Sequence, residues 1–173
     1  MPDGGFRPGM NVQMATAGDA MGGPRTIVAV AVNNVGSDMG ALGALVEQIE
    51  RRTGALPEQV LADANHANHE AITALTQRGL DVLVPERTRP CGGTPEIQAW
   101  KERMASPEAQ QTYRARASLC ELTNANARRM GLTQLLVRSV AKATSVALLT
   151  AFTHDVLAHA STLLGRRVRA RSR

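Results

Sequence analysis

Polar and apolar positions alternate along residues 11–17 (NVQMATA), and residues 26–33 (TIVAVAVN) form a nearly continuous apolar run. Both patterns are typical of β-strands. The sequence between them, AGDAMGGPR, is rich in the turn formers Gly and Pro. We therefore expect a β-hairpin with a long loop.

A helix is expected over residues 38–53, where apolar side chains recur at helical spacing. These side chains are Met39, Leu42, Leu45, Val46 and Ile49. Gly54 follows them and suits the left-handed backbone that often ends a helix. Asp38 or Ser37 is expected to cap the first turn, because its side-chain oxygen can accept a hydrogen bond from a free backbone N–H.

The next segment has the pattern of a strand, a helix and a second strand. Short apolar runs at residues 59–62 and 81–84 bracket a helical segment at residues 68–78, which Gly79 closes. Such β-α-β crossovers are right-handed. Asp63 follows the first strand directly, at the carboxyl edge where sites form in open α/β sheets.

Three further helices are expected in the second half of the chain. Residues 95–104 and 107–130 each begin with a proline, which suits the first helical turn. Residues 139–164 form an amphipathic helix, and the basic sequence RRVRARSR follows as a tail. Large apolar residues of that last helix share one side: Val146, Leu149, Phe152, Val156 and Leu163.

The predicted order of elements is β-β-α-β-α-β followed by helices, which is an α/β pattern. It matches an RNase H-like mixed sheet, made of a hairpin and parallel strands, that lacks its first strand and is followed by long C-terminal helices. We expect residues 1–165 to form this partial domain and residues 166–173 to form a basic tail. A missing strand would leave unpaired strand edges, so we also expect low thermal stability or oligomerisation.

Charge is distributed unevenly along the 173 residues, whose formal net charge is +5. Residues 1–90 carry seven arginines against ten acidic residues, and residues 91–173 carry thirteen basic residues against five acidic ones. The basic half is the expected face for a polyanion. Aromatic residues make up 2% of the chain, so base stacking is not expected.

Cysteine usage and hydropathy bear on where the protein works. Cys91 and Cys120 have neither CxxC spacing nor the density of a disulfide scaffold, which fits a reducing cytoplasm. The first residues lack the basic and apolar regions of a signal peptide. The longest apolar stretch, near residues 146–152, is too short to span a bilayer. We expect a cytoplasmic protein without a membrane segment.

Asp63 and Glu121 are the candidate catalytic residues. They lie on different predicted elements, and arginines share the helix of Glu121, at Arg114, Arg116, Arg128 and Arg129. Carboxylates beside basic residues suit a divalent-metal site that acts on a phosphate backbone. The alternatives are that Asp63 caps the following helix and that Glu121 belongs to a solvated helix face.

Other motifs give weaker signals. His66 and His69 stand three residues apart with Glu70 after them, unlike the HExxH pattern of zinc proteases. His154 and His159 are expected to pack in the fold or lie on its surface rather than bind metal. The sequence has no Walker loop, GxSxG motif or kinase motif, which disfavours nucleotide-dependent chemistry.

Five stretches occur in a recognisable order and span nearly the whole chain: DGGFRPGMNVQMAT, VAVNNVGSDMGALGALVEQIERRTG, PEQVLADANH, RGLDVLVP and SPEAQQTYRARASLCELTNANARRMGLTQLLVRSVAKATSVALLTAFTHD. As a set they resemble the DDE-type transposases of bacterial insertion sequences. The resemblance implies an enzyme that cleaves and transfers DNA strands.

By this resemblance Asp63 is the second aspartate, and Glu121 the glutamate, of a triad that binds two Mg²⁺ ions. The first aspartate of such enzymes lies on the opening strand, ahead of the GFRPxxNVQ segment, and is expected to be missing here. Asp3, Asp19 and Asp38 do not match it.

The chain also departs from the family at single positions. Asn65 and His66 stand where relatives usually have Gly and an aromatic residue, Met10 replaces a common aromatic residue, and Ser139 replaces the glycine of LVRG. These departures, like the missing aspartate, bear on the expected activity.

We therefore predict a partial transposase whose partner is DNA, with a second copy of the chain or a missing N-terminal portion as further partners. The residues expected to contact DNA are Arg114, Arg116, Arg128, Arg129, Arg138 and Lys142. We expect DNA affinity but weak or no cleavage, because a metal ligand is missing. The alternatives are a DNA-binding remnant without activity and another RNase H-like nuclease, although the helices after Glu121 argue against the latter.

Overall fold

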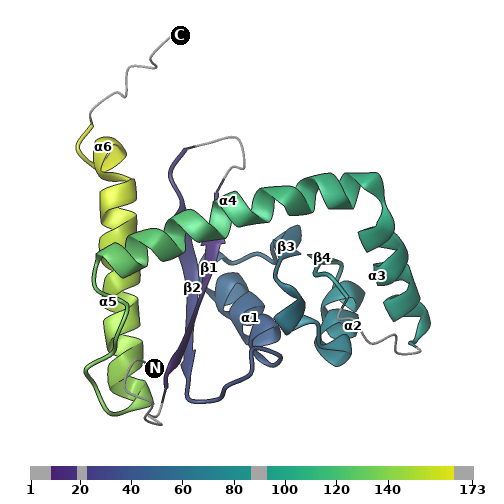
Figure 1. Ribbon diagram of the computed structural model, residues 1–173. Helices are drawn as coiled ribbons and strands as arrows, with labels where there is room; N and C mark the ends of the chain where they lie inside the picture. Colours follow the sequence, from purple (N-terminus) through teal and green to yellow (C-terminus); the bar gives the residue numbers. More distant parts are fainter. Residues whose placement is uncertain (1–8, 19–22, 87–92, 166–173) are drawn as a thin grey trace.

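The computed structural model describes residues 9–18, 23–86 and 93–165, and its elements are arranged as a mixed α/β fold (Figure 1). In chain order they are β1 Asn11–Ala17, β2 Thr26–Asn33, α1 Ala41–Thr53, β3 Gln59–Leu61, the 3-10 turn η1 Ala64–His66, α2 His69–Gln77, β4 Asp81–Leu83, α3 Pro95–Ala105, α4 Pro107–Arg129, α5 Val140–Ala158 and α6 Ala160–Leu163.

The predicted hairpin is confirmed. β1 and β2 pair antiparallel, from Asn11 opposite Asn33 to Ala17 opposite Thr26, and the register shifts between Ala15 and Thr16. This bulge leaves one extra residue on β2, which reverses the alternation of side chains between the two faces. Ile27 therefore packs on the same face as Val30, three positions away.

The predicted β-α-β unit is also confirmed. β3 and β4 pair in parallel, with Gln59, Val60 and Leu61 opposite Asp81, Val82 and Leu83. α2 connects the two strands, and the side chain of Asn68 accepts a hydrogen bond from Ala71 N to cap it. Each strand has three residues, and Val82 and Leu83 of β4 are buried. Because the strands are so short, the unit depends on packing rather than on its own ladder.

The two strand pairs do not join into one mixed sheet within the described residues: β1 pairs with β2, and β3 pairs with β4. In Figure 1 the β3–β4 pair lies on the β1 side of the hairpin, and α4 runs across both pairs. The expected mixed sheet is therefore corrected to two separate strand pairs among the described residues. The physical reason is that no described strand lies between β1 and β3 to connect their backbones.

The hairpin is covered on both faces. On one face Ile27 and Val30 pack with Ala147 and Ala151 of α5. On the other face Ala29 packs with Ala41 and Leu45 of α1, together with partly buried neighbours. A further core surrounds the parallel pair and contains the two large side chains Ile97 and Trp100 of α3, both nearly inaccessible to solvent.

The outer edge of β2, which faces away from β1, is closed by side chains. Gln48 of α1 accepts a hydrogen bond from Val30 N at 2.7 Å and donates one to Val30 O at 3.1 Å. Arg52 donates to Val28 O at 3.0 Å, and Asp155 accepts from Ile27 N at 2.9 Å. The part of this edge from Ile27 to Val30 is therefore protected without a further strand.

Two expectations for α1 and the last helix are wrong. α1 begins after Gly40, with no side-chain cap, because the Asp38 carboxylate accepts instead from side chains of β1. The last helix is interrupted at His159, whose Nε2 lies 2.7 Å from Thr26 Oγ1. Its large apolar side faces away from the sheet, and small residues are buried in their place. Among the helices of the described ranges, none has the combined length and apolarity that crossing a bilayer requires.

Candidate functional site

Asp63 lies just beyond the carboxyl end of β3, as the sequence predicts. Its Oδ1 accepts a hydrogen bond from Asn65 N at 2.9 Å, which caps the 3-10 turn η1. Asp63 does not cap the helix that begins near Asn68, the alternative that the sequence left open, because Asn68 itself caps α2. The carboxylate remains partly exposed, at 39%, so it is also accessible to a ligand.

Helix α4 holds the end of β3 through two of its side chains. Arg116 Nη2 donates to Asp63 Oδ2 at 3.3 Å, and Tyr113 Oη donates to Ala62 O at 3.1 Å. The guanidinium carbon of Arg116 lies 6.0 Å from the centre of the Tyr113 ring, a distance at which a cation is attracted to an aromatic face. Burial raises the pKa of Tyr113, so its hydroxyl stays a neutral donor.

Glu121 lies on the same helix, and its side chain is exposed. Burial raises the pKa of the Cys120 thiol, the nearby charge of Arg116 opposes the shift, and the charges of Asp63 and Glu121 add to it. Both carboxylates are therefore within electrostatic range of one thiol. Each helical residue turns by about 100°, so Glu121, five residues after Arg116, projects about 140° around α4 from the side chain that contacts Asp63.

A metal site of three ligands is not formed by this arrangement alone. Within residues 9–18, 23–86 and 93–165, no group of three or more His, Cys, Asp or Glu side chains is placed to hold an ion. This covers His66, His69, His154 and His159. His154 instead lies 2.9 Å from the Asp155 carboxylate, buried against the hairpin.

Asp38 borders this region and was not predicted as a site residue. Asn11 Nδ2 donates to its Oδ1 at 2.6 Å, and Gln13 Nε2 donates to the same oxygen at 2.5 Å. These bonds, that of Asn11 foremost, lower the pKa of Asp38 despite partial burial, and the charge of His66 contributes. His66 Nε2 in turn lies 4.0 Å from Asp63 Oδ1. The period-two alternation of β1, which puts Asn11 and Gln13 on one face, was the signal for this contact.

Three buried polar atoms around this region make no hydrogen bond to the described part of the chain: Gln13 Oε1, His66 Nδ1 and Arg116 Nε. Buried polar groups normally have a partner. The three atoms are an acceptor on Gln13, a donor on Arg116 and a ring nitrogen on His66 that donates or accepts according to the tautomer. Water or another polar group is the kind of partner that such atoms take.

The basic residues predicted to contact DNA separate into two kinds. Arg116 is half-buried against Asp63, whereas the others are exposed and form no salt bridge within the described ranges: Arg114, Arg128, Arg129, Arg138 and Lys142. On α4, Arg114, Glu121 and Arg128 are spaced by seven residues, close to two helical turns. They therefore share one exposed side of the helix.

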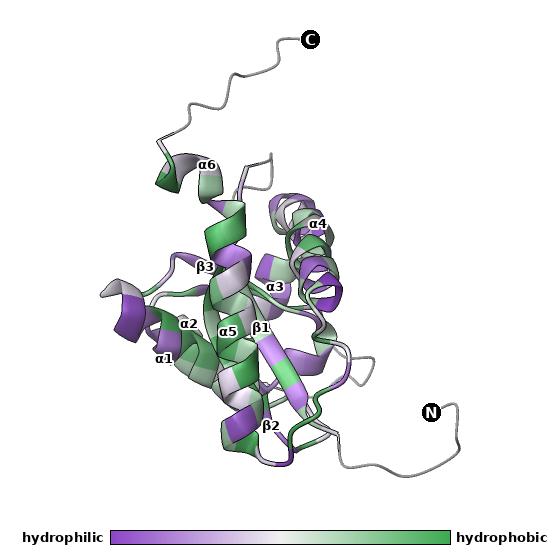
Figure 2. Ribbon diagram, turned by 90° about the vertical axis from the view of Figure 1, so that its left-hand side faces the viewer, coloured by the Kyte–Doolittle hydropathy of each residue, from purple (hydrophilic) through white to green (hydrophobic). Residues whose placement is uncertain are grey.

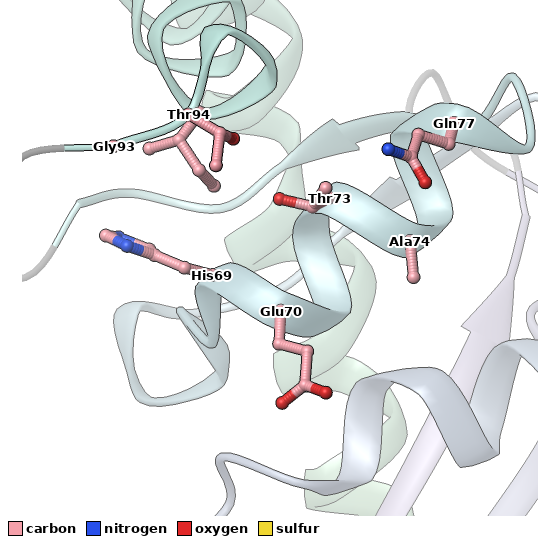
Figure 3. A pocket seen from close by; sticks show the side chains of 8 residues that line it. His69, Glu70, Thr73, Ala74, Gln77, Gly93 and Thr94 are labelled. Atoms are coloured by element: carbon pink, nitrogen blue, oxygen red, sulfur yellow. The ribbon is translucent and has the colours of Figure 1, made fainter.

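A separate open groove of about 740 Å³ lies between α2 and the start of α3. Figure 3 shows His69, Thr73 and Gln77 along α2, with Thr94 across from them. His69 also packs edge-on against Trp100, with ring centres 5.9 Å apart. Neither Asp63 nor Glu121 lines the groove, so it is distinct from the predicted site.

Comparison with known proteins gives no relative for this chain. No protein-family model, curated protein or solved structure matches it.

Proposed function

We propose that the chain is the catalytic part of an RNase H-like, DDE-type transposase that acts on DNA with Mg²⁺. The observation that carries the proposal is the contact between the end of β3 and α4, where Arg116 meets Asp63. Asp63 lies at a strand end, and the helix packed against it bears Glu121 and exposed arginines. Carboxylates and nearby arginines are among the groups that a metal-dependent phosphodiester reaction uses.

The donor chemistry fits Mg²⁺, a hard cation that prefers carboxylate oxygens and retains several waters. Asp63 and Glu121 would hold it, and both carboxylates are accessible to solvent. The chemistry it supplies when bound is activation of water or a 3′-hydroxyl for in-line attack on a phosphodiester. Arg116 holds Asp63 in place, and its charge is positioned to approach a phosphate group of the substrate.

The arrangement of strands supports the RNase H-like assignment. The outer edge of β2 is closed by Gln48, Arg52 and Asp155. Val30 directs its N–H and C=O toward Gln48, so its cross-strand partner Met14 directs its own backbone groups to the opposite edge, away from β2. A further strand between β1 and β3 would pair with that edge, join both pairs into one mixed sheet and bring a third carboxylate beside Asp63.

DNA would lie along the exposed side of α4. Arg114 and Arg128 are separated by about 20 Å along the helix axis, with Glu121 between them. This spacing lets basic side chains contact the backbone on both sides of the bond that is cleaved. The electrostatic attraction is independent of base sequence and weakens with salt.

One observation favours a second candidate function, DNA binding without cleavage. The Asp63 carboxylate is already paired with a guanidinium, and the described ranges offer no third metal ligand beside it. Such a protein would occupy DNA ends through its basic side without cutting them.

A nicking assay on supercoiled plasmid tests the proposal and separates the two candidates. With the full chain and Mg²⁺ or Mn²⁺, the proposal requires slow nicking that is lost in both Asp63→Asn and Glu121→Gln while DNA binding is kept. Glu102→Gln removes an exposed carboxylate from α3 and is the matched control. Binding with no metal-dependent nicking would support the second candidate, and nicking that survives both substitutions would refute the proposed site.

A further inference from the structure

Helix α5 is oriented with its small residues inward. Ala143, Ala147 and Ala151 are spaced by four residues and are 0%, 0% and 6% exposed. Ala147 and Ala151 pack against the β1–β2 hairpin. A surface helix of a monomeric protein normally buries its large apolar residues, so α5 has the orientation of a helix that is covered on both sides.

The outward face of α5 carries the large apolar side chains. Leu149, Phe152 and Leu157 are 66%, 67% and 61% exposed, and Leu163 and Leu164 of α6 are 66% and 68% exposed. Figure 2 views this face directly: α5 lies in front, largely coloured as hydrophobic, and no described element covers it. We call these five residues, together with the less exposed Leu148 and Val156, the α5 face.

The α5 face is large for a monomer. Seven side chains of this size and exposure present on the order of 700 Å² of apolar surface, against roughly 300–600 Å² for the largest patch on a typical monomer. A standard interface buries about 800 Å² per partner. The face therefore has nearly the area that a stable dimer requires.

The chemistry of the face suits a helix as partner. Leu149, Phe152 and Val156 follow the three-then-four spacing of a helix-packing seam. From residue 143 to residue 164 the only formally charged side chain is Asp155, and its carboxylate is bonded to Ile27 N and lies beside His154. The α5 face therefore has no charged side chain that would favour a charged partner.

We infer that the α5 face is the interface of a symmetric dimer, in which α5 of a second copy packs antiparallel across a two-fold axis. An uncharged apolar stripe is self-complementary, as an isologous interface requires. The chain's segments outside the described residues are MPDGGFRP, DAMG, RTRPCG and RRVRARSR, and none has the run of large apolar residues needed to cover the face. The inference does not rest on the proposed function.

Sedimentation velocity of the full chain between about 1 and 100 µM tests the inference, since interfaces of this size give micromolar or tighter affinity. The expected result is a monomer–dimer equilibrium that does not grow further. Leu149→Glu and Phe152→Glu should each raise the dimer dissociation constant at least about 100-fold, because each places two carboxylates, one per copy, in an apolar seam. Far-UV circular dichroism checks that the variants stay folded, which solvent-exposed positions favour.

Leu122→Glu is the matched control, since Leu122 is 51% exposed on α4 and lies outside the α5 face. It should leave the dissociation constant within about twofold. A wild-type monomer at all concentrations would overturn the inference, as would a dimer that persists in both α5 variants, because pairing would then use another surface such as the β1 edge. Assembly beyond a dimer would also overturn it.

Discussion

Arg116 and Asp63, which are 53 positions apart in the chain, meet where α4 crosses the end of β3, with Nη2 and Oδ2 separated by 3.3 Å. The pair places a cation on the carboxylate that we propose as a metal ligand. Arg116 and a divalent metal therefore act on the same group. This relationship makes the proposed metal role of Asp63 testable without an activity assay.

Replacing Arg116 by methionine should strengthen metal binding at Asp63. The substitution removes a positive charge beside the carboxylate, and an exposed charge pair is worth up to about 1 kcal/mol, so Mn²⁺ affinity should rise by up to about fivefold. Electron paramagnetic resonance of free Mn²⁺ measures the affinity directly.

Arg114→Met is the control for that experiment, because it removes the same charge from an exposed position two residues away. It should change Mn²⁺ affinity by less than the Arg116 substitution. Equal effects would show that only the overall charge matters, and Mn²⁺ binding that survives Asp63→Asn would exclude Asp63 as a ligand.

Much of the fold could be predicted because its signals are local. The bounds of β1 and β2 and the start of α4 at Pro107 coincide with their predicted positions. Alternation, turn residues and a proline in the first turn act within a few residues of the element they define. The position of Asp63 after β3 follows from the same local reasoning.

The parts that were missed depend on contacts between distant residues. Asp38 would cap α1 by its position, but Asn11 and Gln13 bind it from 27 and 25 positions away. Likewise, apolar and polar residues of α5 are spread around the helix instead of being confined to opposite sides, so the amphipathic pattern expected from the sequence does not indicate which side packs on the hairpin. The alanines pack on the hairpin because their small side chains allow the helix to approach the strands closely.

Exposed arginines of α4 should contribute to the salt dependence of DNA binding. Each phosphate contact that is lost lowers the slope of log affinity against log salt by about 1. Arg128→Gln should therefore weaken binding to a labelled duplex and reduce this slope, as measured by fluorescence anisotropy between 50 and 200 mM salt. Arg51→Gln, an exposed position on α1, should leave the slope unchanged, and equal slopes for both variants would contradict a DNA-binding role for α4.

Asp81 should make the fold sensitive to acid. Arg103 donates to both of its oxygens and Gln59 donates to one, and the bond from Arg103 is the main reason that the pKa of Asp81 is lowered. Because the folded chain has the lower pKa, ionised Asp81 stabilises the fold above the ordinary aspartate value of 3.8, and this stabilisation is lost as the pH falls through the folded pKa.

Asp81→Asn should accordingly lower the free energy of unfolding by on the order of 1 kcal/mol at pH 7, a modest value because solvent screens the partly exposed pair. The difference from the unsubstituted chain should shrink as the pH falls below 3.8 and through the lowered pKa of folded Asp81. Urea denaturation at a series of pH values measures both quantities. Glu58→Gln, at an exposed position beside β3, should show no such convergence, and a pH-independent loss in Asp81→Asn would refute an electrostatic origin.

Gln48 should stabilise the hairpin through its two bonds to the Val30 backbone. Val30 is 4% exposed, so removing the amide leaves a donor and an acceptor without partners in a site that water reaches poorly. Gln48→Ala should lower the free energy of unfolding by about 1–3 kcal/mol, measured by urea denaturation, and should speed hydrogen exchange at Val30 N–H. Gln111→Ala, an exposed position on α4, should change neither quantity appreciably. If Val30 exchanges equally slowly in Gln48→Ala, then a partner other than Gln48 protects this edge, and the closure of β2 by α1 side chains is wrong.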